Sequence, residues 1–588
     1  MKNLKGGTCM QNEVLNILNN YREKIKISRL QEMLKHQIFI AYIFKKNNFP
    51  FKNIKVSNFN IFKKDIYSCL NKNNFNEKFI MDNLQYLYDS AFYESNKNIL
   101  DFLNRFDKYD LVSLETMFEF LLCHDFSKSN YYENMTSLEL IKLIDLMTQN
   151  NVINNILDIC SGYGNFLIYF TNNRNIKKSN GIELIPTTYF VSIERLIIRN
   201  SNSQIINDDA LQQSLEANYD LVFCNHPWML KYGNPIKKDK INMLDNIDMS
   251  KMRADWGFIS KAINSTNENG KAFVLIPNGC LASINSNEKK IRKDIIENGL
   301  LEYVISMPNN TLNYTSAKYS MLVFSKGNDN ITFVDATHCY KSSSKGREID
   351  ADRIFELINN STNSNVKRPK LDEIRKKEYN LNVDTYFRKE IELPNAQSLK
   401  KYAELFRGYQ YISKNDLELE PGKGEYSIVK IKDLDSNILK YDELSTMDLE
   451  PEKVNRFCLK DGDILITTKA SILKIVLVEN IQDRKVIPTG NLTVIRITNT
   501  GLNPTYLYTF LNGSVGNTII QSLQTGSVIM NIPKKSLEDM KIPLLDKDTQ
   551  EVICNKFKIL NAELINLERK IKNIQNKITD IYSDEVGD

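Results

Sequence analysis

Four runs of sequence decide the fold: ILDICSGYGNFL (residues 156–167), GIEL (181–184), NDDAL (207–211) and YDLVFCNHPW (219–228). Each is short, apolar and closed by small or acidic residues, and they follow one another at the spacing of strand-turn-helix units. Strands that are buried on both faces of a parallel sheet have this continuous apolar character. The stretch therefore predicts an α/β fold with a Rossmann-like, nucleotide-binding sheet.

The residues that close the first three runs suit a nucleotide-like ligand. Gly162 and Gly164 let the backbone approach a ligand closely. A helix is expected from about Asn165, and its unpaired N–H groups would face the same crevice. Glu183 could accept both hydroxyls of a ribose, and Asp209, with Asp208 as the near alternative, could accept from an adenine amino group. A GxG turn alone suits NAD, FAD and S-adenosylmethionine equally.

The fourth run ends in Asn225-His226-Pro227-Trp228. This loop offers an amide oxygen, a backbone carbonyl held still by proline and a flat ring. Two acceptors and a stacking face match a planar exocyclic amine and can align its nitrogen lone pair toward a methyl donor. An ordinary strand-end turn is the alternative interpretation.

Together the turn and the loop resemble the amino-methylating DNA methyltransferases, whose hallmarks are a glycine-rich cofactor loop and an Asn/Asp-Pro-Pro-aromatic loop. The resemblance implies S-adenosylmethionine as cofactor and catalysis by Asn225, His226, Pro227 and Trp228. The candidate cofactor-binding residues in this stretch are Asp158, Cys160, Gly162, Gly164, Asn165, Phe166, Glu183, Asp208 and Asp209.

His226 departs from that pattern, because the family has its first proline there. Any residue supplies the backbone carbonyl that is thought to accept from the target amine, so the chemistry can survive. The lost preorganisation could still lower the rate.

From about Tyr131 to Gly327, the order of elements looks more narrowly like the modification subunit of type I restriction-modification systems. The shared features are an Asp-aromatic-Phe helix (ADWGF, 254–258), a strand ending in proline and glycine, and a later strand ending in proline. In that family an aromatic residue and a threonine close over the methionine end of the cofactor, which makes Tyr132 and Thr136 candidates. A role for Thr136 as a helix N-cap is equally compatible.

The remaining chain divides by composition and spacing. Residues 1–130 have helical spacing and predict a helical N-terminal domain, in which His36 and His124 are interpreted as packing or surface residues. Residues 131–327 form the expected catalytic domain and 328–395 a polar connector. Residues 396–545 resemble half of a type I specificity subunit, an α+β target recognition domain, and 546–588 predict a long coiled-coil helix.

Basic side chains in two regions are candidate DNA contacts, although for any one of them a solvated surface is the simpler interpretation. Lys237 and Lys238 lie in the polar loop after Trp228. The candidates in the recognition domain are Arg407, Lys430, Lys432, Lys469, Lys474, Lys534 and Lys535.

The last helix has an apolar seam that alternates by four and three residues and needs a partner. Two chains are expected to pair through it as a homodimer, each supplying half of a bipartite DNA site; docking on the same chain is the alternative. The seam consists of Ile553, Phe557, Leu560, Leu564, Leu567, Ile571, Ile574, Ile578 and Ile581.

Composition sets broader limits. The chain has 588 residues, a formal charge of +5 and nine cysteines. This length predicts several domains, the charge permits nucleic acid as a partner without arguing for it, and cysteines without a CxxC pair fit a reducing cytosol. No metal-ligand spacing, GxxxxGK[ST] motif, signal peptide or membrane span is found. A soluble, cytoplasmic protein is expected.

The sequence thus predicts a site-specific DNA adenine N6-methyltransferase that carries its own recognition domain, acts on duplex DNA and can associate with restriction subunits. Cytosine N4 presents a similar amine, and the loop cannot exclude it. Two rivals stay open: a methyltransferase acting on RNA or on protein glutamine, and a DNA-binding protein that has lost activity at His226.

Overall fold

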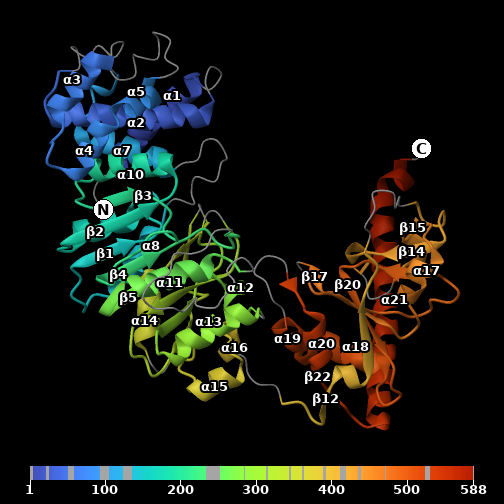
Figure 1. The fold of residues 1–588 in the computed structure, drawn as a ribbon. Coiled ribbons are helices and arrows are strands. Elements are labelled where there is room, and N and C mark those ends of the chain that lie inside the picture. Colours follow the sequence, from blue (N-terminus) through green and yellow to red (C-terminus); the bar gives the residue numbers. More distant parts are fainter. Residues whose placement is uncertain are drawn as a thin grey trace. The chain divides into compact units, whose positions relative to one another are not determined.

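The computed structural model describes the chain in two compact units, Met1–Phe387 and Arg388–Asp588 (Figure 1). The residues that it describes are 4–21, 26–50, 59–92, 105–123, 135–232, 252–283, 285–312, 315–343, 346–360, 363–387, 392–410, 419–434, 439–470, 472–523 and 530–586. Among these residues, no helix is both long enough and apolar enough to cross a bilayer.

The first unit contains a helical layer followed by an alternation of strands and helices. Its helices are α1 (Leu4–Tyr21), α2 (Ile27–Lys46), α3 (Phe59–Cys69), α4 (Phe75–Asp82), α5 (Leu84–Phe92), α7 (Leu111–Cys123), α8 (Leu138–Met147), α9 (Asn165–Asn173), α10 (Pro186–Ile198), α11 (Asp255–Ser265), α12 (Asn278–Leu281), α13 (Ser286–Glu297), α14 (Ala351–Asn359), α15 (Leu371–Lys376) and α16 (Asp384–Phe387). Its strands are β1 (Asn155–Asp158), β2 (Lys178–Glu183), β3 (Gln204–Asn207), β4 (Tyr219–Cys224), β5 (Thr266–Pro277), β6 (Leu301–Ser306), β7 (Tyr319–Phe324), β8 (Thr332–Asp335), β9 (Tyr340–Ser343), β10 (Gly346–Ile349) and β11 (Val366–Lys367).

The main sheet has the strand order β11-β8-β6-β7-β5-β4-β1-β2-β3. The strands from β3 through β5 are parallel, and β7 runs antiparallel between β5 and β6. Helices cover both faces: Ile156 faces the core shared with α8, α9 and α10, whereas Leu157 faces the core shared with α11 and α13. Burial on both faces explains why these strands read as unbroken apolar runs.

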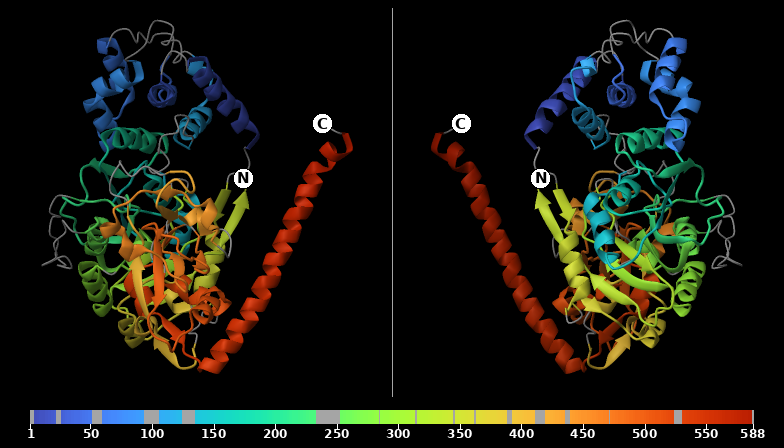
Figure 2. Two further views of the ribbon diagram at one scale, coloured as in Figure 1. Left: turned by 90° about the vertical axis from the view of Figure 1, so that its right-hand side faces the viewer. Right: turned by 90° about the vertical axis from the view of Figure 1, so that its left-hand side faces the viewer.

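The N-terminal helical region, predicted for residues 1–130, packs directly on the sheet layer. Helix α2 is buried on almost every side from Leu30 to Phe44 and contacts α5, α7 and α10. Helix α10 lies between this layer and strands β2 and β3, as Figure 2 also shows. One continuous apolar core therefore joins the helical region to the main sheet.

A buried hydrogen bond ties the two layers together. His36 of α2 and Glu194 of α10 are both fully buried, with 2.8 Å between Nδ1 and Oε1. Burial raises the pKa of Glu194, and the interaction with His36 partly offsets that effect. The prediction that His36 is a packing residue is confirmed; His124 lies outside the described residues.

The structure corrects the predicted connector at residues 328–395. Strands β8 and β11 extend the main sheet, and α14 packs on α8. The polar composition of this stretch was misleading, because apolar residues scattered through it, among them Phe333, Ile354 and Ile374, are buried in the cores of the first unit. The first unit consequently continues to Phe387.

The second unit is built of short strands and helices around its own cores. Its sheets have the orders β13-β20-β16-β18, β15-β14-β19, β12-β22 and β17-β21. Its strands are β12 (Ala396–Ser398), β13 (Ala403–Arg407), β14 (Tyr426–Val429), β15 (Thr446–Met447), β16 (Ile464–Thr467), β17 (Lys469–Ala470), β18 (Ile475–Leu477), β19 (Val486–Pro488), β20 (Leu492–Ile497), β21 (Met530–Asn531) and β22 (Lys541–Pro543). Its helices are η4 (Leu399–Lys401), η5 (Ile431–Leu434), η6 (Tyr441–Glu443), α17 (Pro451–Val454), η7 (Asn455–Phe457), α18 (Pro504–Asn512), α19 (Ser514–Ser522), α20 (Lys534–Asp539) and α21 (Lys547–Val586).

Helix α21 is a single 40-residue helix, drawn in red in Figure 2. At its start, Phe557 packs edge-on against Tyr508 of α18, and Cys554 is buried in the same core. From Leu560 through Ile578 the apolar seam is exposed, by 65% at Leu560 and 55% at Ile571. The first two seam positions thus dock on the same chain, as the alternative interpretation held, and the positions from Leu560 through Ile578 do not.

The contribution of the His36–Glu194 pair to the packing of the helical layer on the sheet can be tested by mutation. Changing His36→Ala leaves the Glu194 carboxylate buried without its partner, which should lower the free energy of unfolding by about 3–5 kcal/mol. Differential scanning calorimetry should register a lower Tm. The matched control is His338→Ala, since His338 is exposed and surface changes stay within about 0.5 kcal/mol. Equal Tm values for the two variants would contradict the assignment.

Candidate active site

Two loops leave the same edge of the main sheet. Strands β1 and β4 are parallel neighbours with Asp158 in register with Phe223, and the Ile159 N–H continues the pairing by donating to the Phe223 carbonyl at 3.0 Å. The strand order reverses between β1 and β4, which in open α/β sheets is where a ligand-binding crevice forms outside the carboxyl ends. The glycine turn follows β1 and the Asn225–Trp228 loop follows β4, so the two loops begin side by side at this edge.

The glycine turn has the conformation that the sequence predicts. Gly162 and Gly164 have φ values of 50° and 78°, in the left-handed region that favours glycine. Gly164 caps α9, which confirms the predicted helix start at Asn165. The Gly162 N–H donates to Glu183 Oε2 at 3.0 Å, and the Ile185 N–H donates to Oε1 at 2.7 Å. The turn is thereby fixed to the end of β2.

Asp158 lies at the bottom of this edge. Its carboxyl group is buried, and within the described part of the chain Oδ1 has no hydrogen-bond partner. Burial raises the pKa of Asp158, and the charge of the neighbouring Cys224 raises it further. A buried acceptor of this kind is costly unless a partner arrives, so the carboxyl group is suited to a hydrogen-bond donor on a ligand.

The other acidic candidates stand at the ends of β2 and β3. Burial raises the pKa of Glu183, although the amides of Ile185 and Gly162 act in the opposite direction. Asp209 accepts from the Leu211 N–H at 2.9 Å and from the Tyr232 hydroxyl at 2.7 Å, whereas Asp208 is exposed. Each can accept a further hydrogen bond, since a carboxylate has about four acceptor positions.

Two candidates serve the scaffold through their side chains. Asn165 donates to the Thr136 carbonyl at 2.6 Å and accepts from Arg195. Phe166 is fully buried and stacks on Phe223 at 5.0 Å, so a ligand could meet only its backbone.

Thr136 lies beside the turn, but Ser137 is the residue that caps α8, which corrects the N-cap interpretation. Tyr132 lies outside the described residues.

The Asn225–Trp228 loop is anchored at its second residue. The His226 side chain is fully buried, with Nε2 3.3 Å from Asp255 Oδ1 and Nδ1 3.7 Å from Cys224 Sγ. Its ring stacks on Phe258 at 4.8 Å between centroids. Pro227 is exposed, and the half-buried Trp228 lies 5.6 Å from the ring of Tyr319. Asn225 is half-buried at the end of β4.

A pair of cysteines connects the two loops. The Cys160 and Cys224 thiols hydrogen-bond to each other, and this contact, with burial, raises the pKa of Cys160. Cys160 belongs to the glycine turn, and Cys224 directly precedes Asn225. The glycine turn is thus in side-chain contact with the last residue of β4, from which the Asn225–Trp228 loop starts.

Three residues in this region were not among the predicted site residues. Asp255 and Phe258 come from α11 and contact His226, and Tyr319 begins β7 and contacts Trp228. The ADWGF segment that contains Asp255 and Phe258 was noticed in the sequence only as a shared helix. No spacing rule brings a residue 29 positions downstream onto His226, so the sequence carries no local signal for this contact.

In the second unit, part of the predicted basic set converges on one cavity of about 530 Å³. Lys474 adjoins this cavity, because its ammonium group donates to the carbonyl of Ile431, a lining residue, at 3.0 Å. Lys534 and Lys535 belong to α20 and do not line it; Lys237 and Lys238 lie outside the described residues. The lining residues are Arg407, Tyr409, Gln410, Lys430, Ile431, Lys432, Lys469, Thr489, Gly490 and Asn491.

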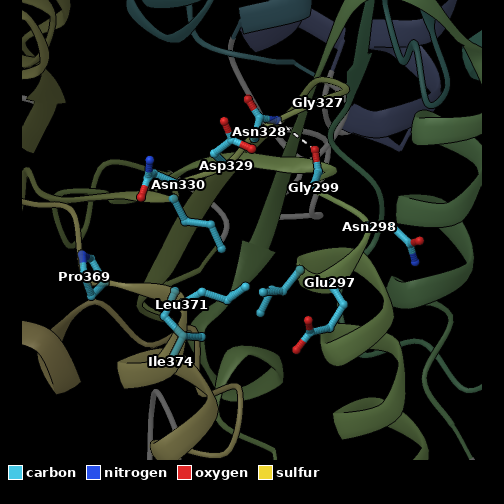
Figure 3. A pocket seen from close by; sticks show the side chains of 12 residues that line it. Glu297, Asn298, Gly299, Gly327, Asn328, Asp329, Asn330, Pro369, Leu371 and Ile374 are labelled. Atoms are coloured by element: carbon cyan, nitrogen blue, oxygen red, sulfur yellow. Dashed lines mark hydrogen bonds between the residues drawn. The ribbon is translucent and has the colours of Figure 1, made fainter.

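Another cavity, of about 320 Å³, lies at the opposite edge of the main sheet, where β6 begins and β7 ends (Figure 3). Its acidic residues do not converge: Glu297 binds Arg375 and Tyr379, and Asp329 lies away from it across the cavity. This cavity offers no arrangement comparable to the edge formed by β1 and β4.

Comparison with known proteins finds a family match in each of the two units. Residues 109–393 match the family described as N-6 DNA Methylase, and residues 398–576 match the type I restriction modification DNA specificity domain. The chain thus matches an N-6 DNA methylase family in one segment and a type I specificity domain in the next. The methylase match ends at 393, beyond the predicted catalytic boundary of 327, in agreement with the folded segment described above.

This methylase-specificity chain is homologous to methylase subunits of type I restriction enzymes. It is 23% identical over 325 residues to the MpnII methylase subunit of Mycoplasma pneumoniae, covering 49% of this chain and 60% of that protein. It is 24% identical over 337 residues to the MjaVII methylase subunit of Methanocaldococcus jannaschii, covering 50% and 57%. The chain thus spans somewhat more than half the length of these curated relatives.

A solved structure shares the fold. The type I restriction-modification methyltransferase subunit from Streptococcus thermophilus superposes with a TM-score of 0.51 at 16% identity, covering 64% of this chain and 99% of that one. The likeness supports a mixed α/β fold with a large sheet flanked by helices.

Proposed function

We propose that this chain transfers a methyl group from S-adenosylmethionine to the N6 amine of adenine in duplex DNA, at sites chosen by its own specificity domain, within a restriction-modification system. The observation that carries the proposal is the pairing of β1 with β4, because it brings the starts of the glycine turn and of the Asn225–Trp228 loop to the same edge of the sheet. A methyl donor in the turn and a flat amine in the loop would then be adjacent.

The residues at the turn fit this cofactor. Asp158 offers a buried acceptor without a partner among the described residues, and Glu183 offers carboxylate oxygens at the ribose position of such folds. Gly162 and Gly164 have positive φ values and no Cβ atom, so the backbone of the turn can approach a ligand closely. When bound, S-adenosylmethionine supplies an electrophilic methyl group.

The loop residues would then hold the target amine. A base rotated out of the duplex would stack on Trp228, while the Asn225 side-chain oxygen and the His226 carbonyl accept its two amine hydrogens. These two acceptors fix the direction of the nitrogen lone pair, so that the chain contributes alignment and needs no covalent intermediate. Adenine is favoured over cytosine because the matched family is described as N-6.

The basic cavity of the second unit supports DNA as the macromolecular substrate. Arg407, Lys430 and Lys469 meet there beside Tyr409, and arginine and lysine side chains contact phosphates and base edges. A protein-glutamine methyltransferase would not need such a unit, and the match of residues 398–576 to a DNA specificity domain favours DNA over RNA. Measuring tritium transfer from labelled S-adenosylmethionine into duplex DNA, RNA and protein in parallel tests this proposal, and transfer only into RNA or protein would refute it.

A second copy of the chain is the proposed partner of α21. The exposed part of the seam continues through Ile578, which is 62% exposed, and a seam of this kind pairs with another helix. Each chain would then contribute one specificity domain to a bipartite site.

Replacing Asn225→Ala should abolish methyl transfer, because the amine loses the acceptor that directs its lone pair. Binding of duplex DNA, followed by fluorescence anisotropy, should be nearly unchanged. The matched control is Asn298→Ala, an exposed asparagine at the opposite edge of the sheet. Turnover of the Asn225→Ala variant at the wild-type rate would remove the catalytic assignment.

Changing Lys469→Ala should weaken DNA binding and make the slope of log K against log salt shallower by about 1, as expected when one phosphate contact is lost. Lys423→Ala is the control, since Lys423 is an exposed lysine of the same unit that pairs with Glu420. An identical salt slope in the two variants would exclude Lys469 from the DNA interface.

Charging the seam with Leu564→Glu and Ile571→Glu should convert dimers into monomers, because two apolar contacts become repulsive. Multi-angle light scattering measures the mass. Asn566→Glu and Asn573→Glu place the same charges on the same helix outside the seam and should leave the dimer intact. A dimer that survives the seam variant would mean that the interface lies elsewhere.

A further inference from the structure

The imidazole of His226 occupies a built site. It is fully buried, paired with Asp255 at 3.3 Å and stacked on Phe258 with an interplanar angle of 18°. Its other nitrogen lies 3.7 Å from Cys224 Sγ. A proline at this position would restrict the backbone φ angle alone, whereas this histidine is held through its side chain from two helical residues and one strand.

The Asp255 carboxyl group also contacts the residue that follows the Asn225–Trp228 loop. The Met229 N–H lies 3.3 Å from Asp255 Oδ1 and 3.2 Å from Oδ2. Met229 has a φ of 63°, a conformation that side-chain-bearing residues rarely adopt unless their surroundings enforce it. Asp255 is thus linked to the residues on either side of Pro227 and Trp228.

We propose that Asp255 is a positioning residue for methyl transfer: through the His226 imidazole and the Met229 amide it gives the Asn225–Trp228 loop the rigidity that a second proline would otherwise provide. This inference rests on the proposed methyltransferase function. It opposes the view that His226 disables the site, because the departure from the family pattern comes with its own support in α11.

The groups around His226 give the proposal a pH signature. Cys224 and Asp255 face the imidazole directly; Cys160 hydrogen-bonds to Cys224, and Cys280 interacts with Asp255 and Arg253. Burial lowers the pKa of His226, but the hydrogen bonds with Asp255 and Cys224 outweigh it and raise the pKa to about 9. A raised pKa means that the ion pair is present at lower pH and lost as the pH rises through about 9.

The test is a double-mutant comparison in the full-length chain. Asp255→Asn should lower kcat at least tenfold, an estimate of about the size that misalignment produces, while the affinity for S-adenosylmethionine in calorimetry stays within about twofold. In the His226→Pro background the same change should cost several-fold less. Asp372→Asn, another aspartate in the first turn of a helix and in an ion pair, is the control.

The pH dependence of kcat distinguishes a positioning role of Asp255 from a purely structural one, because a structural role would not change it. The kcat of the wild type should fall as the pH rises through about 9, and this limb should be absent from His226→Pro. If that variant does not fold, His226→Gln serves instead, because its amide can still donate to Asp255 but carries no charge and cannot titrate. Its kcat should be lower than that of the wild type at neutral pH and should show no fall near pH 9.

Two results overturn the inference alone: an active wild type whose kcat is unaffected by Asp255→Asn, or an equal loss in both backgrounds. A folded wild type that binds S-adenosylmethionine but methylates neither DNA, RNA nor protein overturns the proposed function, and the positioning role with it.

Discussion

The pairing of β1 with β4 is the constraint on which the site depends. Asp158 and Phe223 are in register, so the loops that follow the two strands begin beside each other. This arrangement needs buried strands at the centre of the sheet, and helices cover both of its faces there. A shift of register would separate the glycine turn from Asn225. The packing of the sheet core and the geometry of the candidate site therefore depend on the same register.

Much of this architecture could be predicted from the sequence because it is local. The apolar runs, the two glycines with positive φ and the helix start at Asn165 follow from residues close together in the chain. The folded segment between β8 and α16 was missed because its strands are short and its apolar residues are scattered among polar ones. Burial there comes from tertiary contact with the sheet, which no local pattern records.

Contacts between distant segments could not be predicted for the same reason. His226 meets Asp255 only because α11 packs beside the end of β4. Ser137, and not Thr136, caps α8, a difference of one residue that depends on backbone geometry. In the second unit four of the predicted basic residues line one cavity, although their sequence positions span more than sixty residues and no spacing rule connects them.

The division between Phe387 and Arg388 has a consequence for how such chains diversify. Because the helical layer and the sheet share one core, neither can be replaced without exposing apolar surface, so the first unit is inherited as a block. The second unit has cores of its own. If the proposed function holds, recombination at this boundary would exchange one specificity domain for another without altering the methyltransferase unit, so new target sequences could arise in a single genetic event.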